Sequence, residues 1–103
     1  MSHLDITREN YDECIANVGK PVLLDFWAPR CSPCRQLLPI LERIGQERED
    51  IFVGKVNVDE EAELARRFKV MSIPTLMVVK GGYVTAKAVG FRTREEILEL
   101  LDQ

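Results

Sequence analysis

The chain is poor in three features that help to classify a protein: cysteines, long apolar runs and segregated charge. Its three cysteines are an odd number, which fits a reducing compartment with one working pair better than a secreted disulfide framework. No apolar run approaches the ~20 residues of a membrane span, and the start of the chain lacks a basic stretch followed by an apolar core. We therefore expect a cytoplasmic protein that does not enter a membrane.

Charge of neither sign gathers in one segment. The 14 Lys and Arg and 17 Asp and Glu residues are mixed along the chain and give a net charge of −3. Such a surface mainly favours solubility and argues against nucleic-acid binding. The 103 residues contain no repeat, linker or low-complexity tract, so we expect residues 1–103 to form one domain.

Apolar periodicity predicts strands and helices that alternate over the first two thirds of the chain. This β-α-β-α-β order is typical of a parallel sheet. The expected elements are a short edge strand at Leu4 and Ile6, a helix capped by Thr7, a buried strand at 22–27, a helix from about Ser32 to Arg48 interrupted by Pro39, a strand at 51–58, and a short helix with Leu64, Ala65 and Phe68 inward.

The last third of the chain predicts a hairpin and a helix. Two β-rich runs, 75–80 and 83–89, are joined by Gly81-Gly82, a strong signal for a two-residue turn. Thr93 followed by Glu96 resembles a capping box at the start of the last helix. The hairpin would make the sheet mixed at one edge.

Cys31 and Cys34 stand three residues apart where the buried strand should turn into a helix. A thiolate at a helix N-terminus meets unpaired N–H groups and the positive end of the helix dipole, so its pKa falls. A single Cys-x-x-Cys pair can also be half a zinc site or a structural disulfide. Zinc needs four ligands, and the only other candidates, Cys14 and His3, are not at a paired spacing. A disulfide across so short a loop constrains the unfolded chain little. We therefore favour a redox pair and expect no metal.

Several motifs, taken in order along the chain, resemble those of the thioredoxin family. The run from Val22 through Pro39 is similar to their active-site segment, and the likeness continues through 55–59, Ile73-Pro74-Thr75 and Val89-Gly90. The resemblance covers nearly the whole chain. It implies an α/β protein with the thioredoxin fold: a central mixed β-sheet of four to five strands flanked by four helices.

The resemblance implies the mechanism. The Cys31 thiolate attacks a disulfide in a partner protein, and Cys34 resolves the mixed disulfide. Asp25, the one acidic residue in an apolar strand, would accept the proton of Cys34, because burial raises a carboxyl pKa toward the useful range. The alternative is an acid paired with Lys55 on the neighbouring strand for structural reasons.

The motif departs from the family where thioredoxins usually have Trp-Cys-Gly-Pro-Cys. This chain has Arg30 and Ser32 around Cys31, and keeps Pro33. A cation at Arg30 should favour the Cys31 thiolate and make the couple mildly more oxidising. The alternative is that Arg30 simply points into solvent.

By resemblance, Pro74 follows a cis peptide bond and packs against the sulfurs, while Ile73 offers backbone hydrogen bonds to an extended client segment. Trp27, Pro29, Gly90 and Phe91 would complete an apolar docking surface. Core packing is the alternative role for Trp27 and Phe91.

The expected activity is that of a protein-disulfide reductase. Because the chain has no Gly-rich nucleotide-binding motif, its electrons must come from a separate reductase, and no cofactor is expected beyond the Cys31–Cys34 disulfide. We expect a monomer whose partners are that reductase and disulfide-containing client proteins. A binding module that uses the same groove to hold a partner or, with Cys14, a metal is the alternative.

Overall fold

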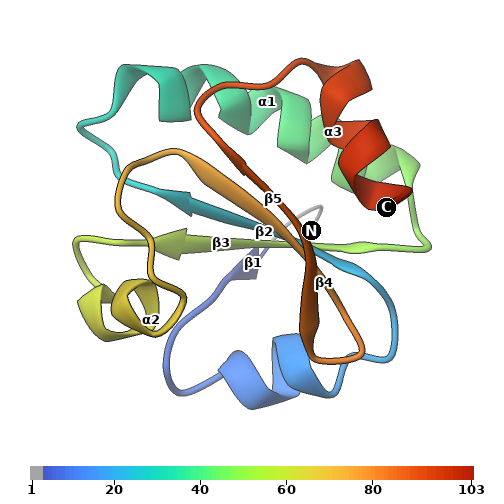
Figure 1. The fold of residues 1–103 in the computed structure, drawn as a ribbon, viewed down its shortest axis with the longest axis horizontal. Coiled ribbons are helices and arrows are strands. Elements are labelled where there is room, and N and C mark those ends of the chain that lie inside the picture. The colour runs from blue at the N-terminus through green and yellow to red at the C-terminus, as the bar shows by residue number, and fades with distance from the viewer. Residues whose placement is uncertain (1–3) are drawn as a thin grey trace.

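A five-stranded mixed sheet forms the centre of the computed structural model, which describes residues 4–103 (Figure 1). Its strands lie in the order β1-β3-β2-β4-β5, with β1, β2 and β3 parallel and β4 and β5 antiparallel to their neighbours. They are β1 (Leu4–Asp5), β2 (Val22–Trp27), β3 (Phe52–Asn57), β4 (Thr75–Lys80) and β5 (Tyr83–Val89). The strand β2 is central and is paired along both edges. This mixed sheet confirms the predicted fold class.

Helices cover both faces of this sheet. They are α1 (Ser32–Glu47), α2 (Ala62–Arg67), α3 (Arg94–Leu101) and a short π-helix, η1 (Asp12–Ala16). In Figure 1, α1 and α3 lie on one side of the sheet and α2 on the other. One buried cluster joins α1 and α3 to the sheet, and a second joins η1 and α2 to it. In residues 4–103, no helix is long and apolar enough to cross a membrane.

Local chemistry sets the ends of the C-terminal elements. Gly81 and Gly82 have φ values of 58° and 85°, which glycine adopts without strain, and they turn β4 into β5. The Thr93 side chain accepts from the Glu96 N–H at 3.2 Å, and the Glu96 carboxylate accepts from the Thr93 N–H at 2.9 Å. The capping box therefore fixes the start of α3, as the sequence predicts.

The first helix differs from its prediction. Asp12–Ala16 is a π-helix, closed by the Asn17 N–H on the Asp12 carbonyl at 3.0 Å. Thr7 does not cap it, because Thr7 and Asn10 bond to each other in a separate turn before it. Ile15 is buried, as the apolar spacing predicts, but so short a segment cannot distinguish the two helix types from periodicity.

Candidate functional site

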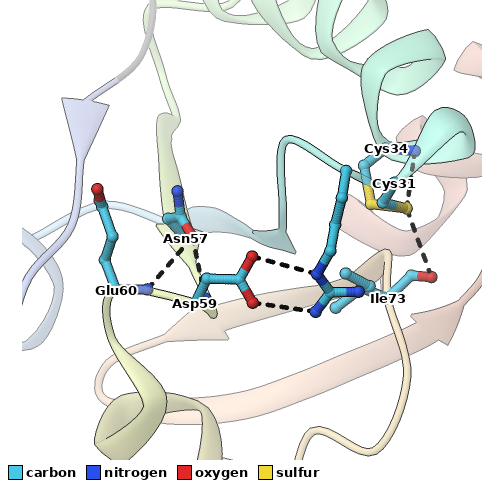
Figure 2. A network of polar contacts seen from close by, with 7 residues as sticks. Cys31, Cys34, Asn57, Asp59, Glu60 and Ile73 are labelled. Carbon is cyan, nitrogen blue, oxygen red and sulfur yellow. Dashed lines mark hydrogen bonds and ion pairs between the residues drawn. A yellow bond between two sulfur atoms is a disulfide. The ribbon is translucent and has the colours of Figure 1, made fainter.

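The cysteine pair lies at the turn where β2 ends and α1 begins. Cys31 is the N-cap of α1 and forms a disulfide with Cys34, with their Cα atoms 5.2 Å apart (Figure 2). The Cys34 N–H donates to Cys31 Sγ at 3.3 Å. Cys31 is half-buried, whereas the exposed fraction of Cys34 is 0%. Ser32 and Pro33 are exposed in the first turn of the helix, where a proline costs no hydrogen bond.

A loop from the other half of the chain meets this pair. The carbonyl oxygen of Ile73 lies 3.8 Å from Cys31 Sγ, as Figure 2 shows, and the Ile73-Pro74 peptide bond is cis. The buried Pro74 in turn accepts the Gly90 N–H at 2.8 Å. Gly90 has a φ of 94°. The structure thus brings together the β2–α1 turn, the start of β4 and the end of β5.

The remaining residues assigned to docking differ in exposure. Pro29 is exposed, Ile73 and Trp27 are half-buried, and Phe91 keeps 40% of its surface exposed. The Trp27 ring packs under the Lys55 ammonium at 4.7 Å, and its indole Nε1 has no partner within residues 4–103. Trp27 is therefore partly a packing residue, while Phe91 leaves much of its ring open to a partner.

Asp25 is a fully buried carboxylate in the middle of β2. Burial raises its pKa from 3.8 to about 7, and Lys55 partly opposes the rise. Among the residues described, neither oxygen of Asp25 has a hydrogen-bond partner. Lys55 is paired with Asp25 in the register of β2 and β3, but its Nζ lies 3.8 Å from Asp5 and over Trp27. Lys55 thus tunes Asp25 through its charge and not through a hydrogen bond.

Arg30 has a partner that the sequence analysis missed. Its Nε and one Nη donate to the two carboxylate oxygens of Asp59 at 3.2 and 3.0 Å. The Asn57 side chain fixes the position of Asp59, because it accepts the Asp59 N–H at 3.0 Å (Figure 2). Both ends of the pair are exposed to solvent. The Arg30 guanidinium is therefore neither an unpaired cation nor simply solvated.

A cavity of about 350 Å³ opens beside this pair. Arg30 forms one wall and Ile73 another, with Val58, Ala65, Val70, Met71 and Ser72 completing it. Met71 is 93% exposed. The sequence offered one signal for this wall, the place of Met71 two residues before Ile73-Pro74.

The sequence left a metal site that includes Cys14 as an alternative to the redox pair. Within residues 4–103, no group of three or more His, Cys, Asp or Glu side chains is placed to hold a metal ion. Cys14 belongs to η1 and packs against the cluster that includes Ile15. His3 lies outside the described residues.

Comparison with known proteins identifies the family. The family model described as Thioredoxin matches residues 2–103. The chain belongs to the thioredoxin family. It is 47% identical over 83 residues to a thioredoxin of Bacillus subtilis strain 168, covering 80% of each chain. It is also 42% identical over 106 aligned positions to a thioredoxin of Staphylococcus haemolyticus, covering 100% of this chain and 98% of the relative.

A third relative is a larger protein. The bifunctional thioredoxin reductase/thioredoxin of Mycobacterium leprae is 38% identical over 96 residues, which cover 92% of this chain and 21% of that one. Thioredoxins are protein-disulfide reductases that a thioredoxin reductase recycles, and they need no cofactor, so the predicted thiol–disulfide oxidoreductase activity is confirmed at the level of the family.

Proposed function

We propose that Cys31 is the attacking cysteine and Cys34 the resolving cysteine of this thioredoxin. The observation that carries the assignment is the difference in access: Cys31 is half-buried at the helix N-terminus, while Cys34 is completely covered. The Cys34 N–H that bonds Cys31 Sγ would stabilise a thiolate there. An external disulfide can reach only the first sulfur.

The reaction then balances in two exchanges. The Cys31 thiolate bonds one client sulfur, the client S–S bond breaks, and the departing client thiolate takes a proton. Cys34 next loses its proton and attacks Cys31, so the mixed disulfide breaks and the second client thiolate leaves. The client disulfide is reduced to a dithiol, and Cys31 and Cys34 are oxidised to their disulfide. The reductase returns the electron pair.

Asp25 is the proposed acceptor of the Cys34 proton. Its pKa of about 7 means that the carboxyl group changes charge near neutral pH, where a general base is most useful. Its oxygens have no hydrogen-bond partner among the described residues, which leaves them available to accept a proton. Lys55 acts by limiting how far burial raises that pKa.

Clients dock, in this proposal, as extended segments along Ile73. A β-like backbone pairing with Ile73 would place the client sulfur at Cys31, 3.8 Å from the Ile73 carbonyl. Pro74, Gly90 and Phe91 border one side of this path, and Trp27 and Pro29 belong to the β2–α1 segment on the other.

We also propose a location, an oligomeric state and partners for this protein. Three cysteines with one redox pair favour a reducing cytoplasm, and charges of both signs mixed along the chain favour a monomer formed by residues 1–103 as one domain. The partners are disulfide-bonded client proteins and a reductase, and the Cys31–Cys34 pair itself serves as the only redox group.

The two serine variants test the cysteine roles. Cys31→Ser should lose disulfide reduction entirely, because Cys34 is completely covered and Cys14, which is half-buried in η1, lies apart from the pair and has no second thiol to resolve a mixed disulfide. Cys34→Ser should still attack a client disulfide but stop at the mixed disulfide, which mass spectrometry detects as a stable adduct of protein and client.

Cys14→Ser is the matched control, since it removes the third thiol and leaves the pair intact. It should reduce the client at the parent rate and form no lasting adduct. Adducts on Cys31→Ser and none on Cys34→Ser would reverse the assignment, and adducts that require Cys14 would refute it.

A further inference from the structure

Three arginines border the redox site, two from the β2–α1 segment and one from the segment after β5. Arg30 precedes Cys31 and walls the cavity that reaches Ile73. Arg35 follows Cys34, and its Nη1 donates to the Pro29 carbonyl at 2.7 Å. Arg92 lies over Gly90, where an added Cβ would be 3.6 Å from its Nη1. We call Arg30, Arg35 and Arg92 the arginine rim.

The rim keeps most of its hydrogen-bonding capacity for a partner. Among residues 4–103, Arg35 and Arg92 bond only backbone carbonyls, those of Pro29 and Phe91. Arg30 uses Nε and one Nη on Asp59, which leaves its other Nη without a partner among residues 4–103. A guanidinium has five donors, so each arginine retains several N–H groups.

The carboxylates near the rim offset only part of its charge. Asp59 neutralises Arg30, and the Glu96 carboxylate, which interacts with the Arg92 charge, is already engaged by the Thr93 N–H. None of the seven residues that line the cavity is acidic. The three arginines thus outnumber the two carboxylates, Asp59 and Glu96, that interact with them, in a chain whose total charge is −3.

We propose that the arginine rim selects clients that carry Asp or Glu beside the disulfide cysteine. This inference rests on the proposed docking along Ile73. An extended client that places its sulfur at Cys31 carries its flanking side chains past Arg30 on the cavity side and past Arg92 on the Gly90 side. Carboxylates there would pair with the free N–H groups, and a Lys or Arg would meet like charge.

The exposed Arg30–Asp59 pair suits this role. Because both side chains are open to solvent, an incoming carboxylate can share or replace Asp59 without burying a charge. The Asn57 side chain holds the Asp59 N–H and keeps the carboxylate beside Arg30 when no client is present. Selection thus comes from the attraction of a client to a rim that is already in place.

Matched peptides test the proposal with the full chain. Symmetrical disulfide dimers of one peptide, with Glu, Gln or Lys on each side of the cysteine, are mixed with the reduced protein and the released thiols are measured. At low ionic strength the Glu peptide should be reduced roughly tenfold faster than the Lys peptide. In ~1 M NaCl, where the Debye length is about 3 Å, the two rates should converge.

Charge-removing variants locate the effect. Arg92→Gln and Arg30→Gln should each lower the Glu-to-Lys rate ratio at low salt, and their combination should lower it further, because only Arg35 of the rim then remains. Arg43→Gln is the matched control: it also removes one exposed positive charge, but from a site in α1 about 14 Å along the helix from Cys34. It should keep the ratio of the parent.

The outcomes separate this inference from the proposed function. Equal rates for the three peptides, faster reduction of the Lys peptide, or a ratio that the double variant leaves at the value of the parent would refute the arginine rim while leaving the reductase intact. Failure to reduce any of the peptides would instead contradict the proposed function.

Discussion

Asp25 is a buried carboxylate in the middle of the central strand, and its oxygens have no hydrogen-bond partner among residues 4–103. Asp25 binds its proton up to about pH 7 in the folded chain, whereas an unfolded Asp releases it near 3.8. Between these values the folded state holds more protons than the unfolded state, so stability falls as the pH rises. Above pH 7 the difference corresponds to roughly 4 kcal/mol.

Asp25→Asn should therefore stabilise the oxidised protein. We expect the free energy of unfolding to rise by up to about 4 kcal/mol above pH 7, with little change near pH 4, because the amide does not ionise. Urea unfolding at a series of pH values measures this. A gain that is the same at all pH values would mean that packing, and not the buried charge, is responsible.

The same variant tests the proton transfer. In the parent, the mixed disulfide should decay faster as the pH rises through about 7, because only the carboxylate can accept the Cys34 proton. Asp25→Asn should be slower near neutral pH and lack that inflection. Single-turnover rates equal to those of the parent would leave Asp25 with a structural role alone.

Arg30 and Asp59 should shift the reactivity of Cys31 in opposite directions. Arg30→Trp removes the adjacent cation and should raise the pKa of Cys31 and make the couple more reducing. Asp59→Asn removes the offsetting carboxylate and should lower that pKa. Iodoacetamide alkylation against pH reports the thiolate, and equilibration with glutathione reports the couple. If neither variant changes the pKa of Cys31 or the potential of the couple, the Arg30–Asp59 pair has no electrostatic effect on Cys31.

At the scale of elements, the sequence was most informative where one local interaction decides the structure. The Gly81-Gly82 turn predicts the observed limits of β4 and β5, and the Thr93–Glu96 box predicts the start of α3. Local chemistry was not enough for η1, where Thr7 bonds Asn10 instead of capping a helix. In that segment, several polar side chains offer competing turns.

The packing of Ile6, the residue that follows β1, against β3 depends on Gly54. A Cβ at Gly54 would lie 2.8 Å from Ile6 Cγ1, and Ile6 is buried. Gly54→Ala should therefore destabilise the fold by about 1–3 kcal/mol through overpacking. Urea unfolding measures the loss. In Gly54→Ala with Ile6→Ala, the combined loss should be smaller than the sum of the single losses, since the clashing atom is gone; additive losses would refute the clash.

At the scale of the whole molecule, the sequence predicted the fold but not the side-chain partners that the fold creates. Arg30 and Asp59 are 29 positions apart, and Lys55 turns to Asp5 and Trp27 although the strand register sets it beside Asp25. Register and motif order identify which backbones are neighbours. They do not determine where long charged side chains place their ends, because those depend on every carboxylate and ring within reach.

The open edge of the sheet at β5 bears on whether the molecule stays a monomer. β5 exposes Tyr83, Val84 and Val89, a pattern that invites pairing with a second copy. Two features oppose it: Thr85 is an extra residue in a bulge between Val84 and Ala86, and Lys87 is the only charge on the strand.

Lys87→Val should therefore cause association that increases with concentration, while the parent sediments as a monomer. Like charges on two antiparallel copies of β5 would repel each other across a new ladder, and the valine removes that repulsion while raising strand propensity. Sedimentation equilibrium over a range of protein concentrations measures the mass. Lys87→Glu is the control, because it keeps a charge at the same exposed position and should remain monomeric. Equal association of the two variants would show that the charge is not the barrier, and association of the parent would contradict the proposed monomer.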